Sequence, residues 1–383
     1  MKKICIVFHS PDRFNGATRS LLDLIETWVK SNRLNIICIL PRNGTAVELL
    51  HSWGIKTYLF NYHDVRYYST TPLKEKLIRN TARRFRMFKE FAVDVRRARK
   101  QLLSENIDVI YSNTGAIFFG AWLSELLNVP HVWHIREMGE EDQNAHMLCG
   151  MNYFIKLLNK SKLIIAISEC VKNKYSKYVG NNTKIIRMYN DVSAANADYS
   201  KRSLHCPMKL LIVGSIIEGK GHEQVIRSIR VLIDKSVPVE LFVAGKASGD
   251  YYNKMLSLVE QLQIQKYVHF LGHVANMKEL KREMNVEVVA SKCEAFGRIT
   301  VEAMLSGLPL VGANTGCTKE LISDNVNGLL YRWGDVDDLS QKIEYVFNNY
   351  NSVNELAKVA FEYAKQFTQG NTANQIESLL LDL

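Results

Sequence analysis

The residues best suited to chemistry lie in the segment 294–304, Glu-Ala-Phe-Gly-Arg-Ile-Thr-Val-Glu-Ala-Met. The segment follows a strand predicted over 286–290 and enters a helix, which places Glu294 in the loop and Glu302 in the first helical turn. Main-chain N–H groups and the positive end of a helix attract phosphate, and carboxylates accept hydrogen bonds from hydroxyl groups. The segment therefore predicts a site for a phosphorylated sugar. The alternatives are a surface loop acid for Glu294 and, for Glu302, a helix-stabilising charge worth about 0.3–1 kcal/mol.

Two other strand–loop–helix junctions could also bind an anion. In the loop 214–221, Lys220 could reach a diphosphate at the start of the next helix. In the loop after the first strand, Gly16 would let the main chain approach an anion closely, with Thr18 able to cap the helix. A solvated lysine and an ordinary turn are the alternatives. Neither loop contains the GxGxxG pattern, which counts against a nicotinamide or flavin enzyme.

Short apolar runs alternate with helical patterns along the whole chain, which is typical of doubly wound α/β domains. The predicted strands are 3–8, 35–40, 56–60, 107–111, 131–134, 163–167, 184–187, 209–214, 239–244, 267–270, 286–290 and 309–311. Apolar periodicity is lost near 190–206, so we expect two domains, 1–190 and 206–365. Ligands of open α/β sheets bind at the carboxyl ends of the strands, and we expect the function to reside there.

Composition supports a soluble, two-domain protein. A chain of 383 residues with 47% apolar and 23% charged residues suits two globular domains and excludes global disorder. No apolar run is long enough to span a bilayer, and the short run near Met1 resembles a buried strand more than a signal peptide. Seven cysteines without a CxxC pair predict neither a disulfide framework nor a zinc site. These features favour the cytoplasm.

The net charge of +10 is concentrated in the segment 74–104. Residues 74–100 contain eleven lysines and arginines against three acids. Apolar residues at helical spacing, reinforced by Phe85, Phe88 and Phe91, predict a helix whose apolar stripe packs internally. We interpret the basic rim as a surface for anionic lipids, at roughly 1 kcal/mol per basic residue. A solvated basic face is the alternative, and nucleic acid is not expected because no recognition module accompanies the segment.

Several motifs in order resemble those of the retaining GT-B glycosyltransferases of the family-4 type. The Glu-x7-Glu segment carries Phe-Gly inside it and Glu-Ala-Met at its end. The other matching segments are 189–192 (Tyr-Asn-Asp-Val), 270–274 (Phe-Leu-Gly-His-Val), 307–311 (Gly-Leu-Pro-Leu-Val), 316–321 (Gly-Cys-Thr-Lys-Glu-Leu) and 325–330 (Asn-Val-Asn-Gly-Leu-Leu). The resemblance extends over essentially the whole chain and is densest in 209–345.

The resemblance implies two Rossmann-like domains facing a cleft, with a final helix, 368–383, that packs back on the first domain. The second domain would hold a nucleotide-diphosphate sugar, and the first an acceptor. Glu302 would bind the ribose hydroxyls, Glu294 the donor sugar near the reacting carbon, and Lys220 the diphosphate, aided by Gly16. The main chain of Val274 would pair with the base. The remaining donor-side candidates are Phe296, Gly297 and Arg298.

On the acceptor side, the resemblance places His134 near the transferred centre, as a catalytic group beside Glu294. A histidine at a strand end is otherwise often structural. Asn113 and Ser168, at other strand ends, are weaker candidates for acceptor contact. The implied enzyme is a hexosyltransferase that retains anomeric configuration by front-face displacement, without a cofactor or metal. Its acceptor would be a lipid-linked glycan of surface polysaccharide synthesis at the inner face of the membrane.

The chain also departs from the family pattern. Ser215 stands where the family often has arginine, and Gly219 where it often has glutamate. The second phosphate cation would then be Arg298 or Lys246. No Asp-x-Asp occurs, so the metal-dependent GT-A chemistry is not predicted. Two alternatives remain, namely a sugar-nucleotide epimerase of the same fold and a non-catalytic binding homologue.

Overall fold

The computed structural model describes residues 1–68, 73–194, 197–368 and 370–383, with side chains from residue 80 onward in the helix that starts at Leu73. The chain forms two compact units, one made of residues 1–191 and 370–383 and the other of residues 192–369. Within the predicted interdomain break, residues 195 and 196 lie outside the described residues, as does residue 369 of the predicted final helix.

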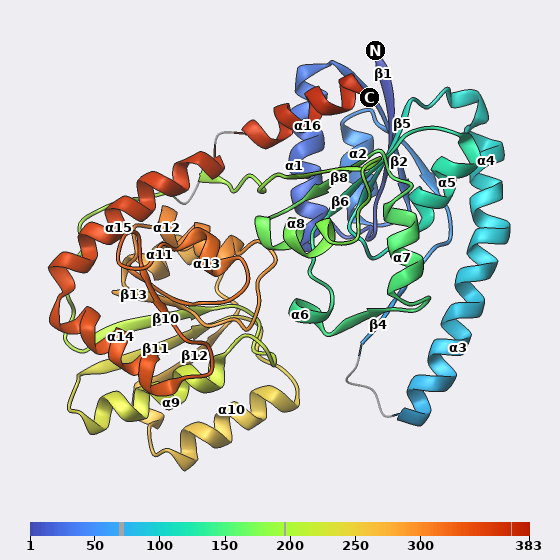
Figure 1. Ribbon diagram of the computed structural model, residues 1–383. Coiled ribbons are helices and arrows are strands. Elements are labelled where there is room, and N and C mark those ends of the chain that lie inside the picture. Colours follow the sequence, from blue (N-terminus) through green and yellow to red (C-terminus); the bar gives the residue numbers. More distant parts are fainter. Residues whose placement is uncertain (69–72, 195–196, 369) are drawn as a thin grey trace. The chain divides into compact units, whose positions relative to one another are not determined.

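The first unit is built on a sheet of seven parallel strands in the order β3-β2-β1-β5-β6-β8-β9 (Figure 1). These strands are β1 (Lys2–Val7), β2 (Leu34–Leu40), β3 (Lys56–Leu59), β5 (Val109–Asn113), β6 (His131–Ile135), β8 (Leu163–Ala166) and β9 (Lys184–Arg187). The strand order reverses between β1 and β5, so the carboxyl ends of these two strands form the edge at which such sheets bind ligands.

An antiparallel pair of short strands, β4 (Arg66–Tyr68) and β7 (Ala145–Met147), forms a separate sheet in the same unit. Neither strand was predicted, because three residues with polar and aromatic side chains show no alternation. The pair joins the segment 64–68 to the chain that follows β6. This pairing positions the polar cluster described below.

Helices pack around the sheet of the first unit. They are α1 (Gly16–Ser31), α2 (Thr45–Ser52), α5 (Phe119–Leu127), α6 (Glu140–Gln143), α7 (Met151–Leu158), α8 (Glu169–Ser176) and α16 (Asn371–Asp382). Figure 1 shows α16 lying beside α1, as the resemblance implied. Its residues Ala373, Ile376 and Leu380 are buried in the core of this unit. The indole Nε1 of Trp28 also donates to the main-chain oxygen of Ala373 at 2.8 Å.

The basic segment forms α3 (Leu73–Lys89), a π-helical stretch over Glu90–Val95, and α4 (Arg96–Leu102). The predicted inward apolar stripe is wrong at Phe85 and Phe88, which are 74% and 62% exposed, and is confirmed at Val95, which is buried. The other buried side chains of the segment are Met87, Glu90, Ala98 and Leu102. The small Ala98 lets the helix approach its unit, and the π-helical turn changes the 3.6-residue phase on which the prediction relied. The side chains of residues 74–79, at the start of the predicted basic segment, lie outside the described residues.

The second unit contains a six-stranded parallel sheet in the order β12-β11-β10-β13-β14-β15. Its strands are β10 (Met208–Val213), β11 (Val239–Ala244), β12 (Val268–Gly272), β13 (Val286–Val289), β14 (Leu310–Ala313) and β15 (Leu329–Tyr331). Its helices are α9 (His222–Asp234), α10 (Asp250–Gln261), α11 (Met277–Arg282), α12 (Arg298–Leu305), α13 (Thr318–Leu321), α14 (Val336–Asn348) and α15 (Tyr350–Ala364). The order reverses between β10 and β13, and the two loops with the predicted anion-binding residues follow these strands. In neither unit does a described helix have the length and hydropathy needed to cross a membrane.

Candidate functional site

In the second unit, the loops after β10 and β13 are packed main chain against main chain. A Cβ atom on Gly221 would lie 2.0 Å from the main-chain oxygen of Ala290, and its φ of +77° also favours glycine. The N–H of Lys292 donates to the oxygen of Gly219 at 2.7 Å. These contacts fix the position of Lys220, which lies between the two glycines.

Lys220 and Glu294 form an ion pair, with 2.5 Å between the Nζ and Oε1 atoms. The main-chain oxygen of Glu294 accepts a hydrogen bond from Cys317 at 2.8 Å, and a Cβ atom on Gly316 would be only 2.7 Å from the Glu294 nitrogen. The two side chains are 29% and 17% exposed, so both reach the surface of the unit. The family resemblance implies that these residues contact separate parts of the ligand, and the structure brings them into direct contact.

Glu302 lies in the second turn of α12, because the helix begins at Arg298; the predicted first-turn placement is wrong. Its Oε1 atom accepts from the Arg298 Nε atom at 2.8 Å. Gly297 forms the N-cap with a φ of +84°, and Phe296 is buried. Val274 lies in the loop between β12 and α11 and packs on a small apolar cluster.

The two candidates for a second phosphate cation differ in their surroundings. Arg298 is engaged by Glu302. Lys246 follows β11, and its main-chain oxygen accepts from the N–H of Ile216 at 3.0 Å, which places it beside the loop that carries Lys220.

In the first unit, Arg136 directly follows β6, and its buried side chain forms hydrogen bonds with neutral groups. Its Nε donates to the Asn113 oxygen, and its NH1 donates to the Asn190 oxygen at 2.6 Å. The Nδ1 atom of His134 lies 3.3 Å from its NH2. Burial lowers the pKa of Arg136 despite the nearby Tyr111 and Glu137. A guanidinium bound mainly by amide oxygens retains its charge at the carboxyl edge of the sheet.

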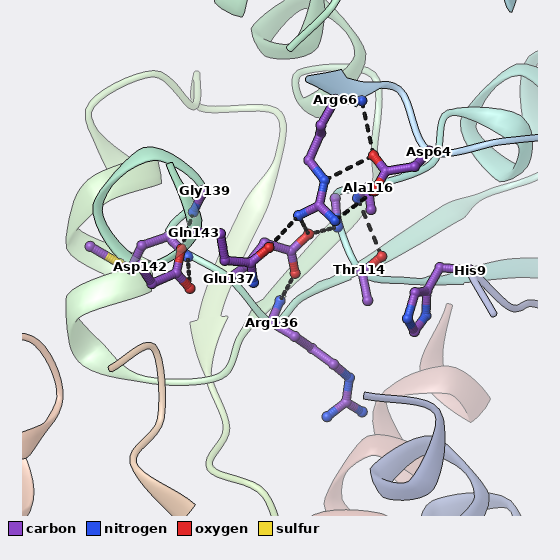
Figure 2. Close-up of polar contacts among 12 residues, drawn as sticks. His9, Asp64, Arg66, Thr114, Ala116, Arg136, Glu137, Gly139, Asp142 and Gln143 are labelled. Atoms are coloured by element: carbon purple, nitrogen blue, oxygen red, sulfur yellow. Dashed lines mark hydrogen bonds and ion pairs between the residues drawn. The ribbon is translucent and has the colours of Figure 1, made fainter. Parts of the chain in front are cut away.

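A network of charged residues lies beside Arg136 (Figure 2). Glu137 is buried and accepts from the N–H groups of Gly115 at 2.6 Å and Arg136 at 3.0 Å. The NH1 of Arg66 is 3.9 Å from Glu137 Oε1, while its Nε and NH2 bind Asp64 at 2.9 and 2.8 Å. Burial raises the pKa of Glu137, and the nearby Arg66 opposes that rise. The network fixes the main chain that carries Arg136.

The predicted acceptor-side residues have internal contacts in this unit. His134 is fully buried, and its Nδ1 is 2.5 Å from the Tyr111 hydroxyl. Burial, with Arg136, holds the pKa of His134 well below its usual value, so the imidazole is neutral. Asn113 is also fully buried and donates to the main-chain oxygen of Ala17 at 3.1 Å. These contacts position Arg136, and direct contact of His134 or Asn113 with substrate stays a prediction.

Ser168 and Gly16 lie at helix starts. The fully buried Ser168 is the N-cap of α8 and accepts from Val171 N–H at 3.2 Å. Gly16 is the first residue of α1, and a Cβ atom there would meet nothing within 4 Å. The predicted cap by Thr18 is wrong, because the side chain of Asn15 caps this helix. It accepts from the Ala17 and Thr18 N–H groups, since an asparagine one residue before a helix reaches the first free amides.

Sequence reasoning missed Arg66 and Asp142. Asp142 accepts from the N–H groups of Met138 at 3.1 Å and Gly139 at 2.7 Å, which closes the loop after Glu137. The only sequence signal for this network was the charged pair Arg-Glu at 136–137, which follows a buried strand.

Together, the two parallel sheets and the paired charges at a carboxyl edge define a doubly wound α/β protein of the class that binds ligands at this edge. Two family descriptions match the chain, "Glycosyltransferase Family 4" over residues 14–195 and "Glycosyl transferases group 1" over residues 200–367. The chain belongs to the family-4 glycosyltransferases, and its fold is GT-B.

Similar proteins include archaeal and bacterial relatives and a solved cyanobacterial structure. An uncharacterized glycosyltransferase of Methanocaldococcus jannaschii is 26% identical over 69% of this chain and 72% of its own length. The N-acetyl-alpha-D-glucosaminyl L-malate synthase of Bacillus anthracis is 24% identical over 61% of this chain and 63% of its own. Among solved structures, Anabaena HepE in complex with UDP has a TM-score of 0.78, with 22% identity and full coverage of both chains.

Proposed function

We propose that this glycosyltransferase moves a hexosyl group from a nucleotide-diphosphate sugar to an acceptor hydroxyl, with retention of anomeric configuration and without a metal. The observation that carries the proposal is the Lys220–Glu294 pair at the carboxyl edge of the second sheet, with Glu302 on the helix that follows. Anabaena HepE was solved with UDP and with UDP-glucose, which makes a uridine diphosphate sugar the first donor to test.

The chemistry follows from an exchange of partners at Lys220. A diphosphate would bind the Lys220 ammonium in place of Glu294, because two phosphates carry more charge than one carboxylate. The freed Glu294 carboxylate could then accept a hydrogen bond from a hydroxyl of the donor sugar. Lys220 and helix amides would stabilise the charge that develops on the leaving diphosphate, which otherwise calls for a metal.

Transfer with retention would proceed on one face of the sugar. The acceptor oxygen bonds to the anomeric carbon, the bond from that carbon to the diphosphate oxygen breaks, and the acceptor proton passes to the diphosphate. Glu294 does not form a covalent intermediate in this scheme.

Donor binding can be tested by thermal stabilisation with UDP, GDP, TDP, CMP and NAD. A ligand at 100 times its Kd stabilises a protein by about 2.7 kcal/mol, and we expect this shift with one nucleoside diphosphate. Lys220→Met and Glu302→Ala should abolish it, and Glu294→Ala should mainly reduce turnover. Asp234→Ala is a matched control, because Asp234 forms a similar i,i+4 pair with Arg230 at the far end of α9. No shift with any nucleoside diphosphate, or a shift with NAD alone, would exclude the proposal.

Two further measurements address the chemistry. Turnover should persist after EDTA treatment if the diphosphate is neutralised by the protein alone. Proton NMR of the first product formed should show the anomeric configuration of the donor. Loss of activity with EDTA, restored by a divalent cation, would contradict metal independence, and an inverted product would contradict retention.

We also propose that α3 docks on an anionic membrane at the inner face, where a lipid-linked glycan of surface polysaccharide synthesis would be the acceptor. The exposed Phe85 and Phe88 lie among exposed arginines, which is the pattern of an interfacial helix. Substituting both with serine should release the protein from vesicles containing phosphatidylglycerol. Tyr345→Ser, at an exposed aromatic on α14, is the control and should leave sedimentation unchanged.

A small soluble acceptor is the second candidate, since the Bacillus anthracis relative is named as a malate synthase. Turnover of lipid-linked and soluble acceptors, with and without vesicles, separates the two. Full activity on a soluble acceptor without vesicles would favour the second candidate.

A further inference from the structure

The first unit contains a cavity of about 190 Å³ between the segment 63–68 and α3. Its polar lining comes from His63, Asp64, Arg66, Arg83, Arg86 and Glu90. A second cavity of about 530 Å³ lies along the same helix; it shares His63, Arg86 and Glu90 with the first and adds Phe85 and Lys89. Both cavities belong to the first unit, whereas Lys220, Glu294 and Glu302 belong to the second.

The arginines of the first cavity differ in how far they are neutralised. Arg66 is engaged by Asp64 through two nitrogens and by Gln143 through a third at 2.9 Å. Arg83 donates to the main-chain oxygen of Arg66 at 3.4 Å, which leaves most of its N–H groups available. Among the residues with described side chains, no carboxylate forms an ion pair with Arg83 or Arg86. These two cations lie one helical turn apart and repel each other.

The other titratable groups in the cavities do not cancel that charge at neutral pH. Glu90 is buried and lies 2.5 Å from the Nδ1 atom of His63. Burial raises the pKa of Glu90 to about 8, so its carboxyl group is mostly protonated at pH 7. Burial, with nearby Arg86 and Arg42, lowers the pKa of His63, which is therefore neutral. Asp94 lines the second cavity only, together with Lys89.

We propose that the cavity between residues 63–68 and α3 binds a phosphate group through Arg83 and Arg86. Each guanidinium presents paired N–H donors that match two phosphate oxygens, and a bound phosphate would relieve the repulsion between the two cations. The phosphate could belong to a lipid headgroup or to a soluble phosphate ester. Phosphate binding itself does not depend on the proposed membrane docking. Only the choice between the two sources of phosphate rests on it.

Hydrogen–deuterium exchange with inorganic phosphate tests the site locally. We expect saturable protection of peptides covering residues 80–95 in the full-length protein. Arg86→Gln and Arg83→Gln should each raise the apparent Kd at least tenfold, about 1.4 kcal/mol. Arg97→Gln removes the same charge from an exposed position of α4, away from both cavities, and should leave the Kd unchanged. Peptides covering residues 214–222 report the donor site separately, so failure of one site does not obscure the other.

Vesicles identify the source of the phosphate. The vesicles contain equal parts of phosphatidylglycerol and phosphatidylcholine. If they protect residues 80–95, and if Arg86→Gln weakens this protection while Arg97→Gln does not, the site binds a lipid headgroup. Protection by inorganic phosphate, with vesicle binding equally affected by both variants, would assign it to a soluble phosphate ester. Absence of saturable protection by either probe, or equal loss with Arg97→Gln in both assays, would overturn the proposal.

Discussion

Glu90 provides a test of the electrostatics inside the first unit. Its side chain is 4% exposed, with Oε1 at 2.5 Å from His63 Nδ1 and Oε2 at 3.3 Å from the His63 main-chain nitrogen. In Glu90→Gln, the amide nitrogen can donate to Nδ1 and the amide oxygen can accept from the main-chain N–H. The substitution therefore mimics the protonated carboxyl group and removes its titration.

The magnitude follows from the pKa of Glu90. Burial, with a smaller contribution from Asp94, raises this pKa from its usual 4.5 to about 8. An acid with a raised folded-state pKa stabilises the fold below about pH 4.5, and this stability is lost as pH rises toward 8. At about 1.36 kcal/mol per pKa unit, the wild-type protein should lose roughly 3 kcal/mol by pH 7 and at most about 5 kcal/mol above pH 8.

Urea unfolding followed by tryptophan fluorescence measures this loss, because four of the five tryptophans (28, 53, 122 and 133) belong to the first unit. At about pH 5, wild type and Glu90→Gln should agree within about 1 kcal/mol, and the variant should be more stable by roughly 3 kcal/mol at pH 7. Glu48→Gln, at an exposed acid of α2, is the control. Parallel pH profiles for wild type and Glu90→Gln would refute the reasoning.

Three other predictions concern packing and positioning. Gly221→Ala should destabilise the second unit by about 2–5 kcal/mol, through the close main-chain contact and the positive φ. Gly16→Ala is the control and should be neutral or slightly stabilising. Equal melting temperatures for the two variants would contradict this prediction. Trp28→Phe leaves the buried oxygen of Ala373 without its donor and should cost about 1–3 kcal/mol in urea unfolding; an unchanged midpoint would show that water replaces the indole. Arg136→Lys should reduce turnover at least tenfold with calorimetric UDP binding unchanged; wild-type turnover would remove Arg136 from the site.

The central strands of the sheets were predictable because they are buried on both faces. The run Ile-Ile-Cys-Ile-Leu at 36–40, for example, has no periodicity that a surface element would show, and it forms the second half of β2. β15 and the pair β4–β7 were absent from the predicted strands, because three residues are too few for a pattern. The face of α3 was misassigned because a hydrophobic period identifies an amphipathic helix and does not say which side packs. Here Phe85 and Phe88 remain on the surface.

The site was predictable only where a loop and its glycines lie close together in the sequence. Lys220 could be placed in its loop, but its contact with Glu294, 74 residues away, depends on how β10 and β13 pair. Arg66 and Glu137 meet only because β4 pairs with β7, which the sequence did not reveal. The sequence did not single out Arg136, because its amide partners, Asn113 and Asn190, come from two other segments.

The return of α16 to the first unit has a consequence for synthesis on the ribosome. Trp28 of α1 shares a core with Ala373, Ile376 and Leu380, which emerge only after the whole second unit, 192–369, has been translated. Domains usually fold as they emerge, but this one must wait with an apolar surface uncovered. We therefore expect a fragment ending at residue 191 to aggregate, and a peptide of residues 371–382 supplied in trans to keep it in solution.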